Sequence, residues 1–301
     1  MLLSVSIPIL TKTVFPEVVS KQAKMVFDAI EDLPNGSNIL LSYDFDPASQ
    51  GELLPMAQAF TRHCSIKGHK QYYMALWPLG SPMVDLSIDT IESEYPDLVY
   101  GINYMKFDYK AGGEAVIRMI TQDLRGMFPL DSKGVPLDKI PMTKNIKNIQ
   151  DMDLIVNVSA GDPGTKQWVQ FAATPFGLKT VSGCTGVQAP QMYLYIPEQL
   201  AGVLGAIKAA AEYEAAIDEV YPTIKDNPKA QEAKRRMGPQ LVAHSLMIGL
   251  IVLGNVIFFL LGIILVRRMG HSSGTPRGGG VGDTIADFFA EKPSDEGAPP
   301  P

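Results

Sequence analysis

The stretch LMIGLIVLGNVIFFLLGIILV, Leu246–Val266, divides the chain into a large region before it and a short polar region after it. It carries no charged side chain, and Asn255 is its only strongly polar residue. As an α-helix this stretch would extend for about 31 Å, the thickness of the hydrocarbon core of a bilayer. A buried core helix would be shorter and would have a polar face. The stretch therefore predicts one membrane-spanning helix.

This division gives four expected regions. They are an α/β domain with a lead-in helix over 1–216, a polar stalk over 217–239, a transmembrane helix over 240–267 and a disordered tail over 268–301. The tail opens with the composition of a flexible linker. Residues 283–292 could form two helical turns with Ile285, Phe288 and Phe289 on one side. That apolar group predicts a docking peptide for a protein partner; a patch lying on the membrane surface is an equal alternative.

The charges around the membrane-spanning stretch predict its orientation. More cationic residues precede it than follow it: Lys225, Lys229, Lys234, Arg235 and Arg236 before, Arg267, Arg268 and Arg277 after. This excess favours a cytoplasmic-facing large domain, and the N-terminus lacks the basic region of a secretory signal. If the apolar start of the chain is instead the remnant of a second membrane segment, the domain would face outward.

Composition excludes several classes of partner and site. A net charge of −6 and an isoelectric point near 5.3 argue against general nucleic-acid binding. The two cysteines, Cys64 and Cys184, are far apart and do not form a disulfide framework. Because the chain has only four histidines, zinc and most transition-metal sites are disfavoured.

Short apolar runs alternate with amphipathic segments through the large region. The runs predict strands at Ile39–Tyr43, Gln71–Trp77, Leu98–Tyr104, Leu154–Val158 and Leu178–Ser182, and the last amphipathic segment predicts a helix from about Pro197 to Glu214. Such alternation is typical of a mostly parallel sheet covered on both faces. We therefore expect a doubly wound, Rossmann-like α/β domain followed by one transmembrane helix. Neither a dinucleotide-binding glycine motif nor a P-loop motif is present.

In open α/β sheets ligands bind outside the carboxyl ends of the strands. The loops expected there are rich in glycine, hydroxyls and carboxylates. The candidate ligand-binding residues are Asp44, Asp46, Gly112, Gly113, Glu114, Ser159, Gly161, Asp162, Gly183, Cys184 and Thr185. The alternative is that these residues only form turns and helix caps.

Asp44 and Asp46 follow the first predicted strand and could share one cation, with Asp162 joining them from another loop. Carboxylate oxygens suit Mg²⁺ or Ca²⁺. The run Leu40–Asp46 resembles the first motif of the haloacid dehalogenase phosphohydrolases, an apolar strand followed by Asp-x-Asp-x-Thr. The resemblance implies that Asp44 is a nucleophile and Asp46 an acid/base. It departs at Ala48, where the family has threonine, and this puts the activity in doubt.

Two further loops contain candidates for a catalytic or an anion-binding group. Cys184 follows a predicted strand and is an alternative nucleophile, but no histidine is expected near it. Gly112 and Gly113 precede a predicted helix whose free N–H groups would attract an anion, although Glu114 would partly repel it.

The leading hypothesis is a non-catalytic, single-pass membrane protein whose α/β domain binds a ligand or a protein partner in a membrane assembly. The alternative is a membrane-tethered hydrolase that uses Asp44, Asp46 and Asp162 around a divalent ion. An asparagine facing lipid is costly, so Asn255, with Gly254 and Gly262 nearby, predicts association of the transmembrane helix with itself or a partner. Tolerance of Asn255 by its own backbone is the competing explanation.

Overall fold

The structure, a computed structural model, describes residues 11, 14 and 16–272. The chain divides into two compact units, Met1–His244 and Ser245–Pro301. The first unit contains the α/β domain. The predicted docking motif of the tail, with Ile285, Phe288 and Phe289, lies outside the described residues.

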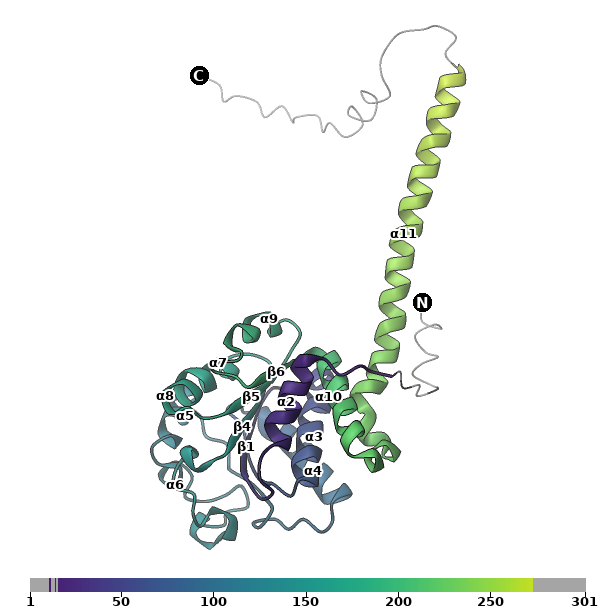
Figure 1. The fold of residues 1–301 in the computed structure, drawn as a ribbon. Coiled ribbons are helices and arrows are strands. Elements are labelled where there is room, and N and C mark those ends of the chain that lie inside the picture. The colour runs from purple at the N-terminus through teal and green to yellow at the C-terminus, as the bar shows by residue number, and fades with distance from the viewer. Residues whose placement is uncertain (1–10, 12–13, 15, 273–301) are drawn as a thin grey trace, which may run out of the picture. The chain divides into compact units, whose positions relative to one another are not determined.

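A six-stranded parallel sheet forms the centre of the first unit (Figure 1). Its strands are β1 Asn38–Asp44, β2 Lys70–Met74, β3 Tyr104–Lys106, β4 Leu154–Ser159, β5 Thr180–Cys184 and β6 Gly202–Gly205. Their order across the sheet is β3-β2-β1-β4-β5-β6, and every neighbouring pair is parallel. The chain winds outward from β1 to β3, crosses back to β4 and winds outward the other way. The predicted doubly wound sheet is confirmed, and its direction switches between β1 and β4.

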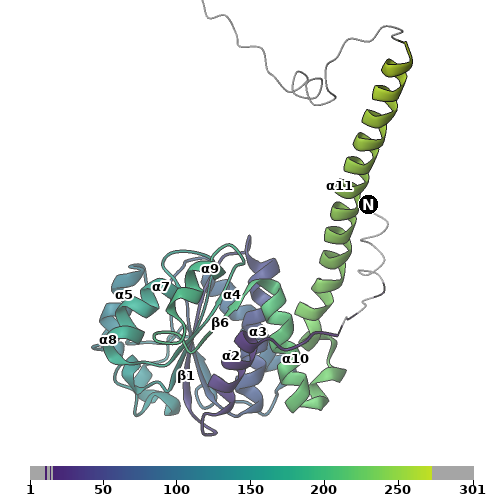
Figure 2. The same ribbon diagram turned by 45° about the horizontal axis from the view of Figure 1, so that its top comes forward.

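Helices cover both faces of the sheet (Figure 2). One face carries α2 Lys21–Glu31, α3 Gln50–Ile66, α4 Gly80–Glu94 and α10 Ala206–Val220. The other face carries α5 Glu114–Ile120, α6 Leu124–Met127, α7 Thr165–Trp168 and α8 Thr174–Phe176, while α9 Ala189–Met192 contacts β6. Successive side chains of β1 alternate between the faces, so Leu41 and Tyr43 pack in one core and Leu40 in the other.

Two predicted strands lie two or more residues further along the chain than expected. The segment before Tyr104 turns instead of pairing, because the Val99 N–H donates to Asn103 Oδ1 (2.9 Å) and Gly101 has a φ of 80°. The fifth strand runs from Thr180 to Cys184 rather than from Leu178 to Ser182. Since both strands are shorter or shifted, the loops that follow them also begin later.

The prediction of one helix from Pro197 to Glu214 is wrong. Gly202–Gly205 forms β6 beside β5, and α10 begins only at Ala206. Gly202 lies so close to α2 that a Cβ atom there would be 2.6 Å from the Val26 side chain. The lead-in helix, α2, begins at Lys21, where Ser20 Oγ accepts from the Ala23 N–H (3.2 Å).

Much of the segment expected as a polar stalk, 217–239, packs within the first unit. The 3₁₀ turns Pro222–Asp226 and Pro228–Gln231 connect α10 to α11, Glu232–Ser272. The buried carboxylate of Glu214 in α10 accepts from the N–H groups of Ala233 and Lys234 at 2.9 and 3.0 Å. These two N–H groups lie in the first turn of α11, where helix donors have no partner in their own helix. The start of α11 is thus fixed to α10.

In the second unit, the segment 246–264 of α11 has apolar side chains on all sides, with Asn255 as its one strongly polar residue. Its large side chains, such as Ile248, Leu253 and Phe259, are exposed within the described chain. The helical segment Pro228–Ile264, which begins in the first unit and includes this apolar part, is long and apolar enough to cross a membrane, judged by length and composition. The chain is thus an α/β domain with one candidate membrane helix.

Candidate functional site

Asp44, the first carboxylate proposed from the sequence, lies at the carboxyl end of β1 and is completely buried. Its Oδ1 accepts from the Leu76 N–H (2.6 Å), and its Oδ2 accepts from Ser42 Oγ (2.8 Å) and Asn157 Nδ2 (2.6 Å). Burial raises the pKa of Asp44 to about 6, and these hydrogen bonds oppose that rise. Both carboxylate oxygens are therefore engaged by the protein itself.

The hydrogen bonds of Asp44 extend into a buried polar network across three strands. Asn157 on β4 accepts from Thr165 Oγ1 (2.8 Å), and Thr165 lies 2.7 Å from Ser182 Oγ on β5 and 3.2 Å from Ser159 Oγ on β4. All four side chains are buried. Since the polar groups satisfy one another, this network joins the central strands at their carboxyl ends.

The structure does not bring the three proposed carboxylates together as a metal site. Asp46 Oδ1 accepts from the Ser49 N–H at 3.1 Å, as in a turn, and Asp162 is exposed on the loop after β4. In the described part of the chain no group of three or more histidine, cysteine, aspartate or glutamate side chains is placed to hold a metal ion. The arrangement needed for Mg²⁺ or Ca²⁺ is thus not formed by these residues.

The remaining residues proposed from the sequence have mainly structural contacts. Gly161 and Gly183 allow close packing, because a Cβ atom would lie 3.1 Å from the Trp77 ring at Gly161 and 2.2 Å from Met56 Sδ at Gly183. Cys184 is buried, and burial raises the pKa of its thiol to about 12, which disfavours the nucleophilic thiolate. Thr185 accepts through its carbonyl from the Gln188 and Ala189 N–H groups.

The glycine pair before α5 also forms a packed turn. Gly112 and Gly113 both have positive φ, and a Cβ atom at Gly113 would lie 3.2 Å from Pro163. Glu114 is exposed and pairs with Arg118, 3.5 Å away on the same helix. The loops after β3 and β4 therefore lie against each other. Trp77 Nε1, after β2, donates to the Pro163 carbonyl (2.7 Å) and adds a third loop to this contact.

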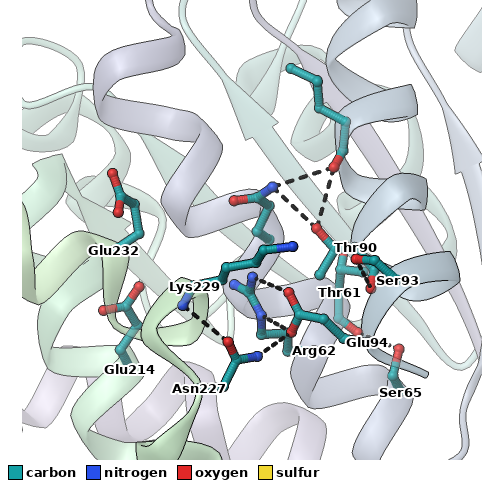
Figure 3. Close-up of polar contacts among 12 residues, drawn as sticks. Thr61, Arg62, Ser65, Thr90, Ser93, Glu94, Glu214, Asn227, Lys229 and Glu232 are labelled. Carbon is teal, nitrogen blue, oxygen red and sulfur yellow. Dashed lines mark hydrogen bonds and ion pairs between the residues drawn. The ribbon is translucent and has the colours of Figure 1, made fainter.

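A hollow of about 350 Å³ lies in the first unit, between α3, α4 and residues 229–236. Figure 3 shows several of the side chains that line it, among them Arg62, Glu94 and Lys229. We call it the arginine hollow. All of its lining residues except Leu86 are polar or charged: Gln58, Arg62, Leu86, Asp89, Thr90, Ser93, Glu94, Lys229, Glu232, Arg235 and Arg236. None of these lining residues comes from a strand end. The hollow is therefore separate from the ligand position expected for an open α/β sheet.

Arg62 is the most buried cation of the arginine hollow, with only 2% of its surface exposed. Its Nε and Nη2 donate to the two carboxylate oxygens of Glu94 at 2.9 and 2.8 Å. Asn227 Nδ2 donates to Glu94 Oε2 (2.6 Å), which fixes the carboxylate from its other side. Arg62 Nη1 is buried and has no hydrogen-bond partner among the described residues. One side of the guanidinium group thus remains unsatisfied.

The cations that α11 contributes to the hollow share a single carboxylate. Arg235 Nη1 and Arg236 Nε contact the two oxygens of Glu232 at 3.3 and 2.9 Å. Arg235 Nε is buried and unpartnered. Lys229 is exposed, and its ammonium group makes no ion pair with any residue that the structure describes. Among the residues that the structure describes, two buried donors of this hollow thus lack an acceptor, and an exposed ammonium group lies beside them without an ion pair.

Sequence reasoning missed this site. Arg62 occurs in an amphipathic helix, where a charged side chain is expected to face solvent. Lys229, Arg235 and Arg236 were interpreted only as charges that orient the membrane helix. The density of cations from 225 to 236 was the available signal, but it did not show that α3 and α4 lie against them.

Comparisons with known proteins do not identify a family. No family model matches the chain, and no curated protein matches it. A solved structure described as MT0777 is 12% identical with a TM-score of 0.33, covering 62% of this chain and 97% of that one. An α,α-trehalose 6-phosphate synthase from Burkholderia multivorans is 10% identical with a TM-score of 0.31, covering 91% of this chain and 50% of that one. Likenesses this distant carry no argument about function.

Proposed function

We propose that the chain is a single-pass membrane-anchored α/β domain that binds a ligand in the arginine hollow and acts as a non-catalytic component of a membrane assembly. The observation that carries this proposal is the unpartnered Nη1 of Arg62 in a side chain that is 98% covered. Leaving a buried charged donor unpaired costs more than about 1–3 kcal/mol. A ligand that supplies the acceptor would recover that free energy, so the hollow is suited to binding.

The alternative, a divalent-metal hydrolase that uses Asp44, Asp46 and Asp162, has less support. A nucleophilic carboxylate needs an oxygen free to reach the substrate. Both oxygens of Asp44 already accept hydrogen bonds inside the protein, and Asp162 lies exposed on a different loop. Catalysis by these residues would require the buried network to open first.

The candidate membrane helix supports the proposed role in a membrane assembly. Asn255 Nδ2 donates to the Ile251 carbonyl of its own helix at 2.9 Å. An asparagine side chain offers a second N–H and an acceptor oxygen, so this bond uses only part of its capacity. Gly254 and Gly262 have no side chains and nothing within 4 Å of their Cβ positions, which would allow a second helix to approach. We infer association of this helix with itself or a partner, with the large domain facing the cytoplasm.

The experiment uses the full chain in detergent micelles and follows unfolding by tryptophan fluorescence. Both tryptophans, Trp77 and Trp168, lie in the first unit, so they report on the domain that contains the hollow. A panel of anionic, neutral and cationic small molecules is expected to contain a compound that raises the unfolding temperature of the native chain but not of Arg62→Gln. Metal-dependent turnover of phosphate esters that is lost in Asp44→Asn would overturn the proposal, as would the absence of any stabilising compound.

A further inference from the structure

The charges of the arginine hollow indicate the kind of ligand that it would bind. Four cations line it, Arg62, Lys229, Arg235 and Arg236, against three carboxylates, Asp89, Glu94 and Glu232. Glu94 already accepts hydrogen bonds from Arg62 and Asn227, and Glu232 forms ion pairs with two arginines. The cationic excess and the unpartnered donors therefore favour an anion over a neutral or cationic ligand.

The number and origin of the free donors favour an anion with at least three acceptor oxygens. Arg62 Nη1 comes from α3, Arg235 Nε from α11 and the Lys229 ammonium from the turn before α11. A carboxylate offers two oxygens, whereas a phosphate monoester offers three in a tetrahedral arrangement. Guanidinium groups bind phosphate with directed hydrogen bonds, and an ammonium group binds it as a mobile point charge.

Hydroxyl and amide groups complete the lining. Thr90 Oγ1 accepts from Gln58 Nε2 (3.1 Å), and the Ser93 hydroxyl lies on the next turn of α4. These neutral groups can donate to or accept from the bridging oxygen and the attached group of a phosphate ester. The exposed carboxylate of Asp89 opposes an anion, so the hollow would hold the phosphate toward α3 and residues 229–236 and away from Asp89.

We propose that the arginine hollow binds a phosphate monoester group, held by Arg62, Arg235 and Lys229. This inference rests on the proposed binding function and names the chemistry of its ligand. The group would come either from a soluble phosphate compound or from a lipid headgroup. A lipid headgroup is a candidate source because Arg235 and Arg236 lie only ten or so residues before Leu246, where the apolar run begins.

The test measures how inorganic phosphate affects the unfolding temperature of the full chain in detergent micelles, with sodium chloride at equal ionic strength as the reference. Phosphate is expected to stabilise the native chain in a saturable manner. Apparent affinity should fall about tenfold or more in Arg62→Gln and Lys229→Gln, since each change removes a charged hydrogen-bond donor. Lys229 is exposed, so its variant should fold even if Arg62→Gln does not. Arg118→Gln, which removes an exposed arginine of α5, is the matched control and should bind like the native chain.

The outcomes separate this inference from the function on which it rests. Equal affinity of the native chain and Lys229→Gln for phosphate, or no saturable stabilisation at all, would overturn the phosphate assignment. If acetate or a neutral compound stabilises the chain and loses its effect in Arg62→Gln, the hollow binds ligands but the phosphate assignment is wrong. If no compound of any class acts through Arg62, the proposed function fails as well.

Nanodiscs distinguish the two sources of the phosphate group. Phosphatidic acid presents a phosphate monoester, whereas phosphatidylcholine does not. If the source is a lipid headgroup, nanodiscs that contain phosphatidic acid will stabilise the native chain relative to pure phosphatidylcholine, and Lys229→Gln will lose most of that difference. If the source is soluble, both nanodiscs will give the same unfolding temperature and inorganic phosphate will still raise it. Lipid stabilisation that is unchanged in Lys229→Gln and Arg62→Gln would contradict a headgroup in the hollow.

Discussion

Arg62 and Glu94 are joined by two parallel hydrogen bonds, from Nε to Oε2 at 2.9 Å and from Nη2 to Oε1 at 2.8 Å. This paired geometry connects α3 to the last residue of α4. It also orients the guanidinium group so that Nη1 is the nitrogen left without a partner. The pair therefore explains both the local packing and why one buried donor lacks an acceptor among the described residues.

Removing the carboxylate of this pair should destabilise the domain and strengthen anion binding together. In Glu94→Gln the buried Arg62 charge loses its partner, and we expect unfolding to require about 2–4 kcal/mol less free energy. The change removes a negative charge from the lining of the hollow, so stabilisation by phosphate should be larger than in the native chain. Urea denaturation with and without phosphate measures both effects.

The matched control for that change is Glu114→Gln, which removes an exposed carboxylate paired with Arg118. Exposed pairs of this kind contribute little, so the free energy of unfolding should change by less than about 0.5 kcal/mol. A Glu94→Gln protein as stable as the control would show that the Arg62–Glu94 contact is unimportant in solution.

Asp44→Asn should weaken the domain through the buried network and not through loss of chemistry. Both carboxylate oxygens of Asp44 accept hydrogen bonds. In either orientation, the amide nitrogen of asparagine would replace one of these acceptors and would face a hydrogen-bond donor. We expect a loss of about 1–3 kcal/mol in the free energy of unfolding. Asp46→Asn is the control, because asparagine keeps the oxygen that accepts from the Ser49 N–H. Equal stability of the two variants would argue that Asp44 is not held as the structure has it.

Glu31 gives the domain a predictable response to acid. Its hydrogen bond with His63, followed by those with Tyr221 and Lys67, lowers the pKa of Glu31 from 4.5 to about 2 in the folded chain. A lowered pKa stabilises the fold at pH values above 4.5, and the stabilisation disappears as the pH falls from 4.5 toward 2. Solvent screening reduces the linked free energy, because the Glu31 side chain is partly exposed. Chemical denaturation across this pH range should therefore show a steeper loss in the native chain than in Glu31→Gln. Parallel curves for the two proteins would contradict a lowered pKa of Glu31 in the folded chain.

The transmembrane helix should lose affinity for its partner when Asn255 is replaced by leucine. Polar contacts between membrane helices contribute about 0.6–1.7 kcal/mol, which corresponds to roughly three- to twentyfold in association. A membrane two-hybrid assay with Asn255→Leu tests this, and Ser245→Leu, at the edge of the apolar run, is the control. Unchanged association in Asn255→Leu would favour the competing explanation, in which the bond from Asn255 to the Ile251 carbonyl satisfies the side chain.

The periodicity of the sequence was sufficient for the class of the fold. Apolar runs such as Leu40–Leu41 are buried on both faces of the sheet, so they lack polar alternation and were recognised as central strands. The run Gly202–Gly205 was missed because a short strand directly before a helix has the same apolar pattern as the first turn of that helix. Only the sheet partner on β5 distinguishes the two, and that contact is not local in sequence.

The candidate site was largely beyond sequence reasoning for a related reason. The strand-end rule pointed to Asp44, whose position at the end of β1 was predicted correctly, but burial and hydrogen bonding decide whether a carboxylate is free to react. The charges of Arg62 and Arg235 appear in the sequence 173 residues apart. Their meeting in one hollow depends on how α3, α4 and the start of α11 pack.

The most direct test compares two variants for phosphate-dependent stabilisation of the full chain, each measured relative to its own unfolding temperature without ligand. If the arginine hollow is the binding site, Arg62→Gln will lose the stabilisation and Asp44→Asn will keep it. Loss of the effect in Asp44→Asn with retention in Arg62→Gln would contradict this account and place the site at the carboxyl ends of the strands.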